Sequence, residues 1–214
     1  MLGLSHRRHR IVAAFALLPL LAACGADTDE GTPLDARTTR DVLPDEKAVP
    51  GWDITAEPTA ESLKKARSQG LVRCYTRASC EDVRFAGVSL FQGTHKPRFT
   101  FMIMTYEDAD TAESAYGRVW KAWKARVPDS RVVNVGDIGD QHDAVAGPGS
   151  SFDERTKSTL VQVRVGSALM LTTGESAAGV DMSDDLVAEF ASTFAERARQ
   201  VQDGEVASAA VDAG

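Results

Sequence analysis

The sequence predicts an α+β domain with an antiparallel sheet of about five strands and two long helices mainly on one face. Two patterns support this class. Short segments with apolar residues at every second position indicate strands. Two longer segments with apolar residues three or four positions apart indicate amphipathic helices. The composition, 43% hydrophobic and 26% charged over 214 residues, is that of a globular domain.

The five expected strands fall into an early pair, a single strand and a late pair. Residues 83–91 and 98–106 form a hairpin, because their apolar residues alternate and the loop between them holds glycine and proline. Residues 130–135 supply a third strand. Residues 158–165 and 168–173 form the last pair, joined by the tight turn Gly166-Ser167. The turn fixes the register of these two strands.

Capping and terminating residues define the helices. A short helix is expected over 59–69, which lies between a proline and a glycine. The first long helix starts at Asp110 and ends before Pro128, which cannot continue a helix. The second starts at Ser183, whose hydroxyl can accept a hydrogen bond from the first turn, and ends before Gly204.

The chain divides into four parts. Residues 1–23 hold three arginines, no acid and an apolar stretch, which is the layout of a secretory signal peptide. Residues 24–42 are polar and acidic, which predicts a flexible tether. Residues 43–202 are expected to form a single α+β domain. The small, acidic residues 203–214 predict a disordered tail.

Net charge excludes one class of partner. The formal charge is −7 at pH 7, and loss of three of the 24 bases with the signal peptide leaves 21 against 31 acids, or −10. A domain this acidic repels nucleic-acid phosphates and anionic lipid head groups. We therefore expect no nucleic-acid partner, and membrane attachment must come from an acyl anchor.

The cysteines indicate the cellular compartment. The run Leu21-Ala22-Ala23-Cys24-Gly25 resembles the lipobox of bacterial lipoproteins. This resemblance implies that Cys24 becomes the mature N-terminus, carries a diacylglyceryl group and anchors the protein at the outer face of the cytoplasmic membrane. Cys74 and Cys80 then remain as an even pair in an oxidising compartment, which predicts a disulfide. A redox-active pair is the alternative, although such pairs usually have two intervening residues and this one has five.

Catalytic motifs of hydrolases, proteases and nucleotide-binding enzymes are absent from the sequence, so neither an enzyme activity nor a cofactor is expected. Residues 136–143 gather carboxylates and an imidazole that could hold a metal ion: Asp137, Asp140, His142 and Asp143. Their spacing matches no EF-hand or zinc pattern. Because tight turns use the same residue types, a turn is the favoured interpretation.

One basic and aromatic segment, 118–126, suggests contact with lipid or nucleic acid. Helical spacing favours another interpretation, because it places Trp120 and Trp123 on the stripe that faces the sheet. The solvated face of the helix then holds the cations Arg118, Lys121 and Lys124.

The alternation in the strands predicts a binding face. One face is apolar, is expected to be covered by both long helices, and consists of Phe99, Phe101, Ile103, Val161, Val163, Val165, Leu169 and Leu171. The opposite face mixes thioethers with polar groups: Thr100, Met102, Met104, Tyr106, Gln162, Arg164, Met170 and Thr172. Left open, this face can form a pocket that binds and orients a ligand. Alternatively, the short helix and the entry segment around Trp52 cover it as a second minor core.

Several features between residues 43 and 202 occur in a recognisable order. They are Leu43-Pro44, Pro50-Gly51-Trp52, the cysteine pair, the hairpin, the amphipathic helix, the 136–140 loop, and the 161–166 run before a final helix. This order resembles the extracellular sensor domain of PknH-type receptor kinases, which also recurs in free lipoproteins. The resemblance implies a cleft for an unidentified ligand. Such domains often have a second disulfide near the last strand, which this sequence lacks because no cysteine follows Cys80.

These observations predict a lipid-anchored, extracytoplasmic binding or sensor domain for a small molecule or a cell-envelope component. We expect it to be monomeric and non-catalytic. The alternative is a protein-interaction adaptor that docks to a membrane receptor or to envelope-assembly machinery.

Overall fold

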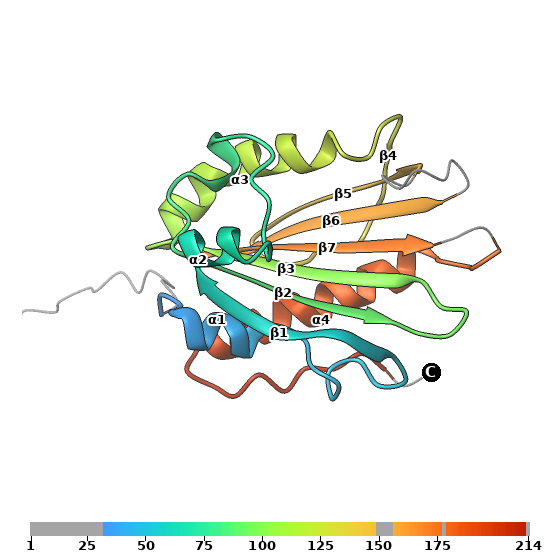
Figure 1. Cartoon of the computed structure of the whole chain (residues 1–214), viewed down its shortest axis with the longest axis horizontal. Coiled ribbons are helices and arrows are strands. Elements are labelled where there is room, and N and C mark those ends of the chain that lie inside the picture. The colour runs from blue at the N-terminus through green and yellow to red at the C-terminus, as the bar shows by residue number, and fades with distance from the viewer. Residues whose placement is uncertain (1–31, 149–155, 177–178, 213–214) are drawn as a thin grey trace, which may run out of the picture.

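The computed structural model describes residues 32–148, 156–176 and 179–212, so the expected signal peptide and Cys24 lie outside the described residues. The strands form one sheet in the order β1-β2-β3-β7-β6-β5-β4, and each neighbouring pair is antiparallel (Figure 1). The expected antiparallel sheet is confirmed, but it has seven strands in place of about five.

The helices and strands have the following bounds. The strands are β1 (Asp53–Ser62), β2 (Phe85–Gln92), β3 (Arg98–Thr105), β4 (Arg131–Val132), β5 (Gln141–Pro148), β6 (Lys157–Val165) and β7 (Ala168–Ser176). The helices are α1 (Ala36–Val42), α2 (Leu63–Ser68), α3 (Ala109–Lys124) and α4 (Asp184–Gln202), with a short 3-10 turn, η1 (Ala78–Cys80). In the described part of the chain, no helix is both long and apolar enough to cross a bilayer.

The two additional strands, β1 and β5, have weak strand sequences. β1 occupies an edge of the sheet, where Pro58 is tolerated because one side of an edge strand needs no hydrogen-bonding partner. It extends to Ser62, so the helix expected over 59–69 is shortened to α2. β5 pairs with β6 along its whole length, although its alanines and glycine have low strand propensity.

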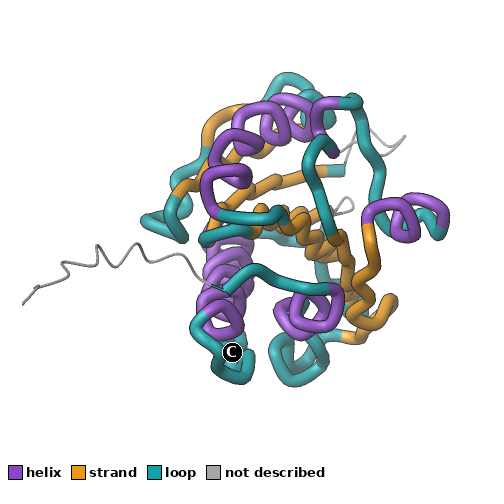
Figure 2. Tube along the Cα trace, turned by 90° about the vertical axis from the view of Figure 1, so that its left-hand side faces the viewer, coloured by secondary structure: helices purple, strands orange, loops and turns teal. Residues whose placement is uncertain are grey.

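The two long helices lie on opposite faces of the sheet, which corrects the expectation that both cover one face (Figure 2). α4 packs on the face that presents Phe99, Phe101 and Val161. α3 packs on the other face, over Leu160 and Leu169. The physical reason is that the central strands are apolar on both sides, so each face needs a cover.

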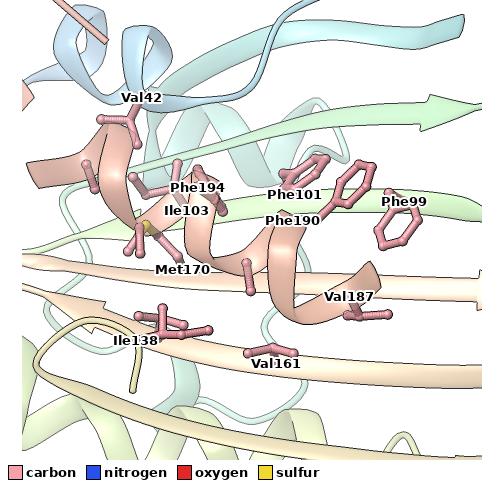
Figure 3. Close-up of a cluster of buried hydrophobic side chains, with 14 of the residues drawn as sticks. Val42, Phe99, Phe101, Ile103, Ile138, Val161, Met170, Val187, Phe190 and Phe194 are labelled. Atoms are coloured by element: carbon pink, nitrogen blue, oxygen red, sulfur yellow. The ribbon is translucent and has the colours of Figure 1, made fainter. Parts of the chain in front are cut away.

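A group of phenylalanine rings packs in the core beneath α4 (Figure 3). Phe190 stacks on Phe99, with ring centroids 4.1 Å apart and planes 9° apart. Phe194 meets Phe101 edge to face at 5.4 Å. Trp52 closes one end, with its ring edge-on to both Phe99 and Phe190 at 5.3 Å. The entry segment around Trp52 therefore packs on the α4 face, which corrects the alternative that it covers the opposite face. Each buried phenylalanine contributes about 1.5–3 kcal/mol to the free energy of unfolding.

Two segments expected to be flexible are ordered instead. Residues 36–42, assigned to the tether, form α1, which begins with a capping box between Asp35 and Thr38. In the tail expected over 203–214, the Val211 amide donates a hydrogen bond to the Ala48 carbonyl at 2.9 Å. Isolated apolar residues explain both corrections, because the buried Leu34, Val42 and Val211 join the core beneath α4.

Arg197 ties these two terminal segments to α4. The residue is 4% exposed, and its guanidinium donates to the carbonyl oxygens of Val42 at 3.0 Å and of Asp41 and Leu43 at 3.2 Å. It also donates to the Ala209 carbonyl at 3.2 Å. One planar side chain thus supplies hydrogen-bond donors both to the backbone carbonyls at the C-terminal end of α1 and to a carbonyl of the C-terminal segment.

We predict that Arg197→Ala lowers the free energy of unfolding by about 3 kcal/mol, because it leaves several buried carbonyl oxygens without donors. Arg197→Lys restores little of the loss, because an ammonium group cannot reproduce the fork of donors. Arg199→Ala is the matched control: this residue is exposed, and its loss changes stability by less than about 0.5 kcal/mol. Urea denaturation measures all three. Equal stability of the Arg197→Ala and Arg199→Ala proteins contradicts the prediction.

Candidate functional site

A cleft of about 370 Å³ opens on the α3 face of the sheet. Its floor consists of two rows of side chains that cross the strands, because directly paired residues of antiparallel strands point to the same face. The first row is Ala56, Leu90, Thr100 and Thr173, and the second row is Val88, Met102 and Leu171. Leu90 and the two threonines are only partly buried, so neither long helix fully covers this part of the sheet.

The walls of the cleft come from the segment after α2 and from the last turn of α3. The first wall contains Gly70, Leu71, Arg73 and Tyr75, and the second contains Trp123. Tyr75 meets Trp123 edge to face, with ring centroids 4.8 Å apart and planes at 84°. The Arg126 guanidinium carbon lies 5.0 Å from the Tyr75 ring centroid, within the range of a cation–π interaction.

A disulfide between Cys74 and Cys80, as expected, closes the loop that holds Tyr75. We call residues 74–80 the disulfide loop. The loop is also tied to α3, which runs beside it (Figure 1). Arg118 of α3 donates to the Ala78 carbonyl at 3.1 Å and to the Asp82 carboxylate at 3.0 Å. The disulfide and these two hydrogen bonds fix the first wall relative to the second.

Of the eight residues expected on the binding face, Thr100 and Met102 line the cleft. Met104 and Tyr106 share their face of the sheet but are fully buried in the core that α2 and α3 cover. Burial raises the pKa of Tyr106, so its hydroxyl stays neutral. Among the described residues, this hydroxyl has no hydrogen-bond partner.

Gln162 and Arg164 also lie on the α3 face, where each has a structural role. The Gln162 side-chain amide donates to the Tyr116 carbonyl at 3.0 Å, and the Tyr116 hydroxyl lies 3.4 Å from the Gln162 carbonyl oxygen. Burial raises the pKa of Tyr116, and Asp143 adds to the shift. The Arg164 side chain is 12% exposed and donates to Gln141 at 2.8 Å and to Asp140 at 3.1 Å. These contacts join α3 to β6 and brace the β5–β6 end of the sheet.

Met170 and Thr172 lie on the opposite face, which corrects their expected place. Met170 pairs with Ile103 and Val163, and it is buried in the core beneath α4. Leu169 and Leu171 accordingly belong to the α3 face. The cause is the hairpin turn: Val165 pairs directly with Ala168, so even-numbered residues of β7 share a face with odd-numbered residues of β6.

The four candidate metal ligands do not converge. The Asp140 carboxylate accepts hydrogen bonds from Arg164 and from the Gly166 amide, the latter at 2.8 Å. The imidazole of His142 lies against the Ile138 backbone, with Nδ1 3.2 Å from the carbonyl oxygen. Asp143 is placed beside Tyr116 on the neighbouring helix. Across the three described ranges, no group of three or more histidine, cysteine or acidic side chains is arranged to hold a metal ion, Asp137 included.

Sequence reasoning missed most of the residues that form the walls. Helical spacing places Trp123 on the stripe that faces the sheet, yet the residue is only partly buried and borders the cleft. No sequence pattern indicates Arg73 or Tyr75, because they lie in a loop without periodicity. The predicted disulfide could have indicated Tyr75 as a site residue, since a short closed loop holds its aromatic side chain in a fixed position.

No protein-family model matches the chain, and no curated protein matches its sequence. Among solved structures, the fold is similar to that of the extracellular domain of PknH from Mycobacterium tuberculosis. The TM-score is 0.51 over 82% of this chain and 100% of that chain, with 8% sequence identity. This likeness supports the PknH-like sensor fold that the order of elements indicated.

Proposed function

We propose that this chain is a non-catalytic, extracytoplasmic binding or sensor domain that takes a small molecule or cell-envelope component into the cleft over Met102. The observation that supports this proposal is the composition of the cleft. Its floor is apolar except for two threonine hydroxyls, and aromatic rings border one side. Ligand pockets typically combine an apolar lining with a few polar groups in about 300–1,000 Å³. The volume of about 370 Å³ lies in this range.

The similarity to an extracellular domain supports an extracytoplasmic location, and the disulfide is compatible with an oxidising compartment. We further propose that a diacylglyceryl group on Cys24 anchors the domain. Leu34 is already buried in the core. Cys24 lies ten positions before it in the sequence, so the linker spans at most about 35 Å. The anchored domain therefore lies close to the bilayer.

Mass spectrometry of the mature membrane-bound protein tests the anchor. We predict an N-terminal peptide that begins at Cys24 and carries the added mass of a diacylglyceryl group. Cys24→Ala abolishes this mass because it removes the acceptor thiol. A mature protein with an unmodified Cys24, or with residues 1–23 still attached, contradicts the anchor.

A neutral fluorescent probe, N-phenyl-1-naphthylamine, tests whether the cleft binds a ligand. We predict saturable binding with one site per chain, because the floor excludes water from an apolar molecule of this size. Leu90→Glu weakens the binding tenfold or more, because it places a carboxylate on the partly exposed floor.

Leu186→Glu is the matched control for that substitution. Leu186 is also a partly buried leucine, but it lies near the start of α4 on the opposite face of the sheet. We expect its replacement to leave probe binding unchanged. Circular dichroism shows whether both variants are folded. Equal probe affinities for the two folded variants contradict the cleft as the binding site.

A further inference from the structure

We infer that the cleft accepts an anionic amphiphile, with a single apolar chain on the floor and a phosphate or carboxylate group at the arginine-bearing wall. This inference rests on the proposed function, because it names the chemical class of ligand for the same cleft. The inference is based on the distribution of charge around the cleft.

The two segments that supply the walls are basic, although the protein as a whole is acidic. We call residues 63–84 and 116–126 the basic rim. They hold ten of the 24 lysines and arginines but only two of the 31 acids. The segments are far apart in the sequence, yet the contacts of Tyr75 with Trp123 and of Arg118 with Asp82 bring them together. The two contacts therefore bring both basic segments to the same side of the molecule, with Arg73 in the cleft lining and Arg126 over Tyr75.

Most of these cations have no carboxylate partner. Lys65 forms an ion pair with Glu61 at 2.6 Å, and Arg118 forms one with Asp82 at 3.0 Å. Within the described ranges, the other eight cations of the basic rim form no ion pair. An uncompensated group of like charges produces a positive potential beside the low-dielectric floor, and such a potential attracts anions.

The cleft combines this potential with apolar surface. Arg73 is exposed and lines the cleft directly, and Arg126 is held over Tyr75 at its margin. No acidic residue lines the cleft. A second hollow of about 490 Å³ lies between α2 and the loop closed by the disulfide, and its lining holds two arginines and one acid, Arg67, Arg77 and Glu81. An apolar chain on the floor would thus have its head group beside guanidinium groups, which form strong, paired hydrogen bonds with phosphate and carboxylate.

Three twelve-carbon amphiphiles, used below their critical micelle concentrations, test the inference by isothermal titration calorimetry on the mature protein. They are dodecyl phosphate, the uncharged tetraethylene glycol dodecyl ether and the cationic dodecyltrimethylammonium. We expect one bound dodecyl phosphate per chain, with an affinity at least tenfold higher than that of the uncharged compound. The cationic compound should bind most weakly.

Charge reversal locates the head group. Arg73→Glu should remove the tenfold preference for dodecyl phosphate and leave the affinity of the uncharged compound unchanged. Lys47→Glu is the matched control, because Lys47 is an exposed cation in the segment before β1 that packs with α1 and α4. It should change neither affinity. A folding defect would lower the affinity for both compounds, so the comparison separates loss of charge from loss of structure.

Four results overturn the inference. Equal affinities for the three amphiphiles show that the rim does not select charge, and the proposed cleft function then survives if N-phenyl-1-naphthylamine still binds. Inorganic phosphate that binds as tightly as dodecyl phosphate shows an anion site without a chain. A dimer in light scattering that Leu90→Glu dissociates shows that a second copy occupies the cleft. If none of the amphiphiles binds and N-phenyl-1-naphthylamine does not bind either, both the inference and the proposed function are overturned.

Discussion

The central strands of this sheet are apolar on both faces, and most of the remaining structure follows from that constraint. On β3, Phe101 points toward α4 while Met102 points toward the α3 side. Neither face can remain in water without a large cost in free energy. α4, α1 and the two terminal segments cover one face, while α3, α2 and the disulfide loop cover the other. The second cover is incomplete over β1, β2 and parts of β3 and β7, and the cleft lies there.

Sequence reasoning located the elements with strong local patterns and missed those without them. The hairpin of β2 and β3, the pair β6–β7 and both long helices all have regular periodicity or clear caps, such as the Ser183 hydroxyl that accepts from the Leu186 amide. β1 and β5 lack such patterns, because their pairing depends on neighbours distant in the sequence. The opposite placement of α3 and α4 was nevertheless accessible from the nearly continuous apolar runs of β3 and β7.

Only two of the residues that line the candidate site could be predicted from the sequence. Alternation placed Thr100 and Met102 on the correct face, and the structure brings them to the cleft floor. The error at Met170 came from treating each strand separately, because the two-residue turn at Gly166 already fixed which residues of β6 and β7 share a face. The walls could not be predicted, because the contact of Tyr75 with Trp123 joins segments 48 residues apart in the sequence.

The central claim is that a ligand enters the cleft over Met102, and the methionine methyl groups offer a direct measurement. Met102 lies on the cleft floor, Met104 is buried one row further along β3, and Met170 is on the opposite face. In protein labelled with ¹³C at the methionine methyls, titration with dodecyl phosphate should shift the Met102 resonance saturably and leave Met170 unchanged, with at most a small effect at Met104. An unmoved Met102 resonance, or a larger shift at Met170, would contradict the account.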